Sequence, residues 1–279
     1  MRVYSASMRF LNINSLTLLI VIIALTACSK FQKVRKSADW KEKYEAALVY
    51  FEDKDYYRTN ILLEEILPII RGTEEAEIAN FKYAYSYFYQ DQFILSSHYF
   101  KTFSDVYSRS EYAMEAEYMY AYSLYLQSPE PALDQTSTYE SIAALQLFIN
   151  KYPYSEYSTE ADKLINGLQD KLETKAYESA KLYYTIQRHK AAIVAFENFQ
   201  KEYPDSDYQD DVAYYLVDAA YQFAMVSIER RQKERFEKSL QLYQKMVDKF
   251  PDSEFIKSAE KIYAETIEEL TKFADLNNS

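Results

Sequence analysis

The sequence predicts an all-α protein built from stacked helical hairpins, and three observations support this fold class. The 279 residues include only two Gly and six Pro, so the chain is poor in the residues that form tight turns between β-strands. One phrase, an aromatic residue followed by Pro, one further residue and Ser, occurs at 152–155, 203–206 and 250–253. Between these phrases, small and bulky apolar residues recur at helical spacing.

Each copy of the phrase is expected to end one helix and begin the next. Pro cannot continue a helix, and a Ser side chain can accept hydrogen bonds from the free N–H groups of the helix that follows. A fourth copy at 107–110 has the same aromatic residue and Ser but lacks the Pro. The chain is therefore expected to be a row of helix–turn–helix units.

The unit at 176–204 fits the tetratricopeptide (TPR) pattern. Ala180 and Tyr183 take the small and large positions of its first helix, and Ala192 and Phe196 those of its second. Small residues let two helices approach closely, and the aromatic residues fill the space that remains. The same frame places the small residue of each first helix at Ala47, Ala84, Ala121, Ala180 and Ala220. We therefore expect a TPR-like α-solenoid of about five degenerate repeats, longer than the standard repeat of roughly 34 residues.

Residues 1–27 are expected to be a signal peptide and not part of the fold. Arg2 and Arg9 precede an apolar run at 16–24 that is too short to span a bilayer. The run Leu25-Thr26-Ala27-Cys28 follows and resembles the lipobox of a bacterial lipoprotein, with Cys28 as the lipid attachment site. The alternatives are an ordinary secretory signal, or an uncleaved anchor, with an incidental Cys.

Residues 28–39 are expected to be a lipidated tether. Lys30, Lys33, Arg35 and Lys36 could rest on anionic headgroups, or the segment could be a merely solvated linker. Ser29 after the Cys resembles an outer-membrane sorting signal. The expected location is thus the outer membrane, lipid-anchored and facing the periplasm.

The body divides into an amino-terminal half at 40–153 with three repeats and a carboxy-terminal half at 154–279 with two. The apolar pattern from 155 to 188 contains no stop signal, which predicts one helix of roughly 30 residues. The polar stretch at 128–138 is the long loop of the body, either a contact loop or a plain insertion. The other expected helical segments lie at 40–70, 74–90, 92–107, 111–127, 191–203, 210–228, 237–250 and 254–273, with a solvated charged extension at 229–235.

Several functional classes are disfavoured by composition. The formal charge of −11, without a basic face after residue 43, argues against nucleic acid as a partner. His98 and His189 lie far apart in sequence, so a His/Cys metal site is not expected. Gly72 and Gly167 stand alone, whereas loops that hold phosphates or dinucleotides need several glycines. We expect neither an enzyme nor a cofactor.

The most informative side chains are aromatic residues outside the packing positions of the repeat. In the TPR frame, the corresponding first-helix positions face the concave groove, and Tyr combines apolar area with a polar tip that suits peptide backbones. The alternative is that irregular twist buries these rings against neighbouring helices. The candidate groove residues are Tyr44, Phe51, Phe81, Tyr85, Phe88, Tyr89, Tyr118, Tyr122 and Tyr125.

The segments 152–161, 172–184 and 203–206 resemble the BamD family of TPR lipoproteins, which belong to the outer-membrane β-barrel assembly machinery (BAM complex). The resemblance covers about 40–270 and is strongest at 145–210. The lipobox and the long helix followed by a Tyr-Tyr pair agree with it.

The resemblance implies a scaffold without a cofactor. Its amino-terminal repeats would receive targeting segments of unfolded outer-membrane proteins, and its carboxy-terminal repeats would hold a POTRA domain of a BamA-like protein, among other BAM subunits. The turn Arg188, His189 and Lys190 looks like the family's Arg-Gly turn without its Gly and is the expected partner contact. Ala195 stands where relatives often carry an Arg.

Two other functions fit the same features. One is a TPR lipoprotein that serves cell-wall synthesis or division. The other is a nutrient-binding lipoprotein of the SusD kind, although those chains are usually longer and carry glycan-stacking Trp, whereas this chain has one Trp.

Overall fold

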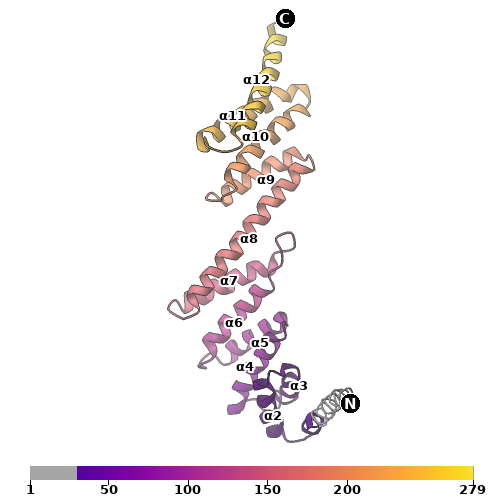
Figure 1. Cartoon of the computed structure of the whole chain (residues 1–279), viewed down its shortest axis with the longest axis vertical. Helices are drawn as coiled ribbons and strands as arrows, with labels where there is room; N and C mark the ends of the chain where they lie inside the picture. The colour runs from indigo at the N-terminus through magenta and orange to yellow at the C-terminus, as the bar shows by residue number, and fades with distance from the viewer. Residues whose placement is uncertain (1–29, 279) are drawn as a thin grey trace, which may run out of the picture. The chain divides into compact units, whose positions relative to one another are not determined.

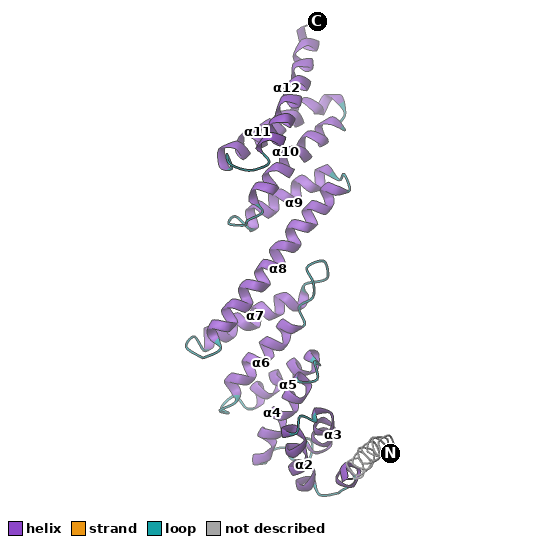
Figure 2. Ribbon diagram, viewed as in Figure 1, coloured by secondary structure: helices purple, strands orange, loops and turns teal. Residues whose placement is uncertain are grey.

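The structure is a computed structural model that describes residues 30–278, with side chains described to residue 273. Cys28 and the expected signal peptide at 1–27 lie outside the described residues. All regular elements of the described chain are helices that follow one another as helix–turn–helix pairs (Figures 1 and 2). The predicted all-α, TPR-like fold class is confirmed.

The chain forms two compact units. Of the described residues, the first unit takes 30–129 together with 136–165, and the second takes 130–135 together with 166–278. The boundary falls inside α8, Ser158–Thr185, a single helix of 28 residues. The prediction of one long helix in this region is confirmed.

The first unit contains three helical hairpins, and the second continues with α8 and four further helices. The helices of the first unit are α2 (Trp40–Glu52), α3 (Tyr56–Ile66), α4 (Glu74–Phe88), α5 (Phe93–Val106), α6 (Ala113–Leu126) and α7 (Thr136–Lys151). Those that follow α8 are α9 (His189–Glu202), α10 (Gln209–Met225), α11 (Glu229–Lys249) and α12 (Ile256–Asn278). The charged stretch at 229–235, expected as an extension, forms the first turns of α11.

The five anchor alanines of the repeat frame are all buried. Ala47, Ala84, Ala121 and Ala180 are 0% exposed and Ala220 is 2% exposed. Small hydroxyl residues of the second helices pack against the first helices and donate to their backbone, as Ser141 does to the Ala121 carbonyl over 3.4 Å and Ser239 to that of Val217 over 3.2 Å. This pairing allows close helix contact without an unsatisfied hydroxyl.

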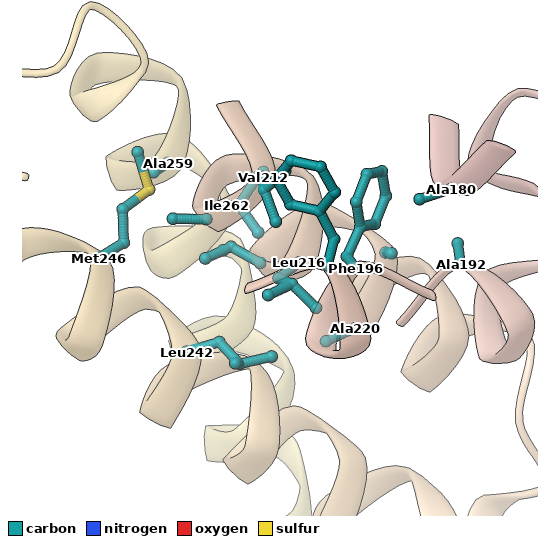
Figure 3. Packing of buried hydrophobic residues seen from close by; sticks show 14 of the residues in the cluster. Ala180, Ala192, Phe196, Val212, Leu216, Ala220, Leu242, Met246, Ala259 and Ile262 are labelled. Atoms are coloured by element: carbon teal, nitrogen blue, oxygen red, sulfur yellow. The ribbon is translucent and has the colours of Figure 1, made fainter. Parts of the chain in front are cut away.

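Figure 3 shows the core of the second unit. Phe196 is fully buried in the same cluster as Ala180 and Ala192, the small residues of the paired helices α8 and α9. Its ring lies parallel to that of Tyr215 from α10, with centroids 5.5 Å apart. The bulky residue therefore fills the space that the two alanines leave, as the TPR frame predicts.

A ring stack recurs at the turns between repeats. The aromatic residue two positions after the Ser of each phrase lies on a ring of the preceding first helix, which connects consecutive repeats. The stacked pairs are Phe81 with Tyr112 (centroids 4.7 Å apart), Tyr118 with Tyr157 (4.4 Å), Tyr177 with Tyr208 (4.2 Å) and Tyr214 with Phe255 (5.1 Å).

The Ser of the phrase fixes the same turn. Ser206 Oγ accepts from the backbone N–H of Tyr208 over 3.0 Å and donates to the Glu173 carboxylate of α8. Ser110 repeats the pattern with Tyr112 and Glu77, and Ser253 with Phe255 and Asp210. The predicted capping role of Ser is wrong for α6 and α10, because Tyr112 and Tyr208 are the N-cap residues and neither helix has a side-chain cap bond. The Ser instead bonds to the N–H of the N-cap residue and to a carboxylate of the previous repeat, which fixes the turn before the helix.

The polar loop before α7 is held at both ends. Lys175 Nζ donates to the carbonyl oxygens of Pro131 (3.0 Å) and Leu133 (2.6 Å). The Gln135 amide, 3% exposed, donates to the carbonyl oxygens of Glu130 and Leu133. These bonds close the loop on itself and on α8.

Candidate functional site

Eight of the nine candidate groove residues lie in one continuous series of ring contacts. We call this set, with the addition of Tyr56, the aromatic array, and it belongs to the first unit. Phe51 contacts Tyr89 (centroids 6.2 Å apart), Tyr89 stacks on Tyr85 (5.5 Å), Phe81 and Phe88 contact Tyr85 (5.0 and 6.3 Å), Phe88 contacts Tyr122 (6.0 Å), and Tyr122 stacks on Tyr118 and Tyr125 (5.8 Å each). The series thus runs over α2, α4 and α6, the first helices of three repeats.

Tyr44 lies apart from the array. It is half-buried and packs against the core cluster of the first hairpin, which contains Ala47, Leu62 and Leu63. Burial raises the pKa of its phenol, with a smaller contribution from the nearby Glu75 carboxylate. Tyr44 therefore belongs with the packing of that hairpin.

The rings of the array differ in exposure. Tyr89 is the most accessible at 49%, whereas Tyr118 is 8% exposed and lies against Phe148 and Tyr157. The others are half-buried. Because these rings are only partly covered, the array combines internal packing with an accessible aromatic surface.

Tyr85 is held more firmly than its neighbours. Its hydroxyl donates to the Glu115 carboxylate of α6, and its ring meets the buried Phe100 edge-on with centroids 4.9 Å apart. Burial and the adjacent Glu115 carboxylate both raise the pKa of the Tyr85 phenol, burial having the larger effect. The hydroxyl therefore stays neutral and links the second repeat to the third.

Charged groups border the array. Lys82 Nζ lies 4.1 Å from the centroid of the Phe51 ring and 3.0 Å from the Glu52 carboxylate. A surface of rings with both signs of charge at its margin can bind an extended peptide through side-chain contacts and hydrogen bonds to the peptide backbone.

Tyr56 belongs to the array although the repeat frame does not point to it. It begins α3 directly after the helix cap Asp55, and its ring stacks on Tyr89 with centroids 4.7 Å apart and an interplanar angle of 24°. The repeat frame assigns groove positions to first helices only. Tyr56 lies at the start of a second helix, so its aromatic side chain was the only feature of the sequence that could have indicated it.

The second candidate site surrounds the turn between α8 and α9, within the second unit. Gln187 has φ +58°, in the left-handed region, Arg188 caps α9, and His189 and Lys190 begin that helix. The left-handed position is where Gly would be unstrained, and it falls one residue before Arg188.

All three expected contact residues line one cavity of about 740 Å³, which we call the carboxy-terminal groove. Its apolar wall is exposed: Tyr183 is 44% accessible, Val194 50% and Val226 71%. Ala195 also lines the groove, so an Arg at that position would place a cation where this chain has an apolar surface. The remaining lining residues are Gln187, Ala191, Asn198 and Phe223.

A smaller cavity of about 440 Å³ continues past Lys190, Val194 and Phe223. The Arg235 guanidinium lies 3.8 Å from the centroid of the Phe223 ring, and Lys238 pairs with Glu197 over 3.1 Å. Arg188, Lys190 and Arg235 thus place cations around an apolar floor. Such a surface fits a partner segment that carries apolar residues next to carboxylates.

His189 has a buried ring nitrogen in this region. Its ring Nδ1 is buried and has no hydrogen-bond partner among the described residues. A buried polar atom without a partner is costly for the folded state.

Residues 30–278 lack two other kinds of functional feature. None of the helices in this range combines the length and apolar character needed to cross a bilayer. Nor does the same range contain a group of three or more His, Cys, Asp or Glu arranged to hold a metal ion.

Stacked helical hairpins with an aromatic array in one unit and an apolar, cation-edged groove in the other define a TPR-like repeat protein with candidate binding surfaces. Residues 36–210 match the model of the YfiO family, described as outer membrane lipoprotein. Because the match covers more than half of the chain, the protein belongs to this outer membrane lipoprotein family. A search of curated proteins finds no match.

Proposed function

We propose that this protein is a lipoprotein scaffold of the β-barrel assembly machinery, anchored in the outer membrane through Cys28 and facing the periplasm. Its aromatic array binds extended targeting segments of unfolded outer-membrane proteins. Its carboxy-terminal groove binds a POTRA domain of a BamA-like protein. Membership of the outer membrane lipoprotein family supports the location, and the two surfaces support a binding role.

The observation that carries the proposal is the continuity of the aromatic array across three repeats. An extended peptide has side chains on alternate sides and a polar backbone between them, so it needs a long surface with apolar area and hydrogen-bonding tips. The array offers this combination through its half-buried rings and the exposed Tyr89.

Binding in this scheme relies on preorganisation. The rings are fixed by contacts with one another and by the Tyr85–Glu115 hydrogen bond, so little side-chain freedom is lost when a peptide docks. The scaffold then holds the segment in an extended form without consuming a cofactor.

The partner can be identified by affinity purification. Tagged, lipidated protein purified from its own membranes should bring with it a BamA-like protein with POTRA domains, and its depletion should lower the level of β-barrel proteins. Co-purification of division or cell-wall enzymes, together with a septation defect on depletion, would instead support the cell-wall or division function. Failure of the depleted cells to grow on one particular glycan would support the SusD-like function.

The peptide surface can be tested with Tyr89→Ala and Tyr122→Ala, the first the most exposed ring of the array. Loss of one aromatic contact of roughly 0.5–1.5 kcal/mol weakens binding of an unfolded barrel-protein segment by about two- to tenfold per ring, measured by fluorescence anisotropy. Tyr154→Ala is the matched control, because that ring is 99% exposed and stands outside the array. Equal affinity for all three variants would contradict the assignment.

The partner surface can be tested with the double variant Arg188→Glu and Lys190→Glu. Reversing two cations at the groove should reduce recovery of the partner severalfold while the helical content stays the same. The double variant Lys257→Glu and Lys261→Glu, which changes two exposed lysines of α12, is the control for the same change in net charge.

A further inference from the structure

The segment just after the lipidation residue packs on the body. Residues 30–35 are helical, and Phe31 is 5% exposed in the same core cluster as Ala47 and Leu62. Its ring meets Tyr50 edge-on, with centroids 5.7 Å apart. Burial of an aromatic ring in a hairpin core fixes the position of the backbone that carries it.

Cations of the hairpin and of the segment strengthen this docking. The Arg58 guanidinium lies 5.3 Å from the Phe31 ring centroid and 5.6 Å from that of Tyr50. Arg35 Nε pairs with Glu65 over 3.2 Å, and Lys43 Nζ pairs with the same carboxylate over 2.5 Å. These ion pairs are partly exposed, so they orient the segment more than they stabilise it.

The side of the segment that faces away from the hairpin is basic. Phe31 and Val34 pack against the core cluster, whereas Lys30, Lys33 and Lys36 are exposed. This cluster of exposed lysines belongs to a chain with a formal charge of −11. An acidic protein that keeps a basic, ordered segment beside its anchor has a surface complementary to anionic headgroups.

The distance to the anchor is short. Cys28 precedes Phe31 by three residues, and three residues of extended chain span at most about 11 Å. A lipid on Cys28 therefore cannot lie far from the first hairpin, whatever path the intervening backbone takes.

We propose that residues 30–36 form a docked cap that holds the first helical hairpin against the lipid surface, with Lys30, Lys33 and Lys36 on anionic headgroups. The inference rests on the lipid attachment in the proposed function. In this arrangement the first repeat is held at a fixed position on the bilayer, whereas a flexible tether would leave its distance from the bilayer variable.

The single Trp of the chain, Trp40, reports this approach because it begins α2 and packs near the same cluster. The full lipidated protein is placed in vesicles that contain phosphatidylglycerol and a dansyl headgroup lipid, and energy transfer from Trp40 is measured. Strong transfer is expected for the natural protein and at least a twofold loss for Phe31→Ala. Phe31→Leu, which keeps an apolar side chain, should retain most of the transfer, and Tyr57→Ala, which removes a ring that is 68% exposed, should retain all of it.

The contact between the three lysines and the anionic headgroups can be tested separately with a triple variant. Substitution of Lys30, Lys33 and Lys36 by Gln should abolish the difference in transfer between vesicles with and without phosphatidylglycerol, while Phe31 keeps the cap docked.

Mass spectrometry and vesicle flotation separate the possible failures. A bare Cys28 overturns the lipid attachment of the proposed function and the cap with it. An acylated, floating protein with weak transfer, or with transfer that Phe31→Ala leaves unchanged, overturns the cap alone. Transfer that is equal with and without phosphatidylglycerol overturns the role of the three lysines.

Discussion

Tyr85 and Tyr89 lie one turn apart on the α4 side of the aromatic array, yet their environments differ. The Tyr85 hydroxyl is bound to Glu115 and its ring rests on Phe100, whereas Tyr89 is 49% exposed. A single residue type therefore serves two purposes here. The bound phenol joins two repeats, and in the proposed function the exposed phenol contacts the peptide.

Replacement of Tyr85 by Phe should destabilise the first unit. The ring stays in place, but the Glu115 carboxylate loses a donor in a half-buried position, so the free energy of unfolding should fall by about 1.5 kcal/mol. The measurement is urea unfolding followed by circular dichroism. Tyr89→Phe is the control and should change stability by less than about 0.5 kcal/mol. Similar losses for both variants would show that the Glu115 bond contributes nothing.

Among short elements, the turns of the α2–α3, α4–α5 and α8–α9 hairpins share an unusual backbone. Lys54, Asp91 and Gln187 have φ of 61°, 57° and 58°, and each directly precedes the cap residue of the following helix. The left-handed region is strained for residues with a Cβ atom. These turns keep polar residues where Gly would relieve the strain.

Gln187→Gly should therefore raise stability. Relief of the left-handed strain is worth about 1–2 kcal/mol, from which the greater freedom of Gly in the unfolded chain subtracts up to about 1 kcal/mol. A rise of a few degrees in the thermal midpoint is expected. Arg188→Gly is the adjacent control, because Arg188 has φ −87° and gains nothing from Gly. A lower midpoint for Gln187→Gly would contradict the strain argument.

The turns between repeats depend on the Ser of the repeated phrase. Ser206→Ala removes the acceptor for the Tyr208 N–H and the donor to Glu173, so a loss of about 1 kcal/mol in unfolding free energy is expected. Ser179→Ala lies on the exposed side of α8 and should be close to neutral. Calorimetry of the two variants side by side decides the point.

Some features of the repeats could be predicted from the sequence and others could not. Ala84 and Ala180 could be recognised because a small residue at a close helix contact is a local requirement that repeats along the chain. The stack of Tyr177 on Tyr208 was missed, although the aromatic residue two positions after each Ser was visible in the repeated phrase. Its partner is set by how one hairpin packs on the next, which no single helix encodes.

The candidate sites show the same division. The repeat frame selected Tyr85, Tyr89 and Tyr122, and the structure brings them into one array. It could not separate the buried Tyr118 from the exposed Tyr89, because exposure depends on rings from neighbouring repeats. It also could not show that the turn at Arg188 opens into an apolar groove, since Val226 comes from another repeat.

At the scale of the whole molecule, the 30 tyrosines make stability sensitive to alkali. Burial raises the pKa of Tyr118 to about 12 and also raises the pKa values of Tyr83, Tyr85, Tyr177 and Tyr184, with smaller contributions from hydrogen bonds and neighbouring ionisable groups. In the unfolded chain these phenols ionise near pH 10. The folded state therefore holds protons that the unfolded state releases.

It follows that stability is fully present below about pH 10 and falls as the pH rises from 10 towards 12. The urea midpoint should be level between pH 8 and 9 and then decline, and the rise in phenolate absorbance should accompany the loss of helical signal. Complete ionisation of all tyrosines in a chain that keeps its helices would contradict the burial of these phenols.

The ring stacks at the turns between repeats also determine how the chain can be divided. Because Tyr157 covers Tyr118 and Tyr208 covers Tyr177, a fragment that stops at the Pro of a phrase uncovers a ring on its last complete hairpin. Such a fragment would expose an apolar surface at its carboxy-terminal end and self-associate. Soluble fragments for expression should instead end just after Tyr157 or Tyr208, so that each contains the ring that covers its last hairpin.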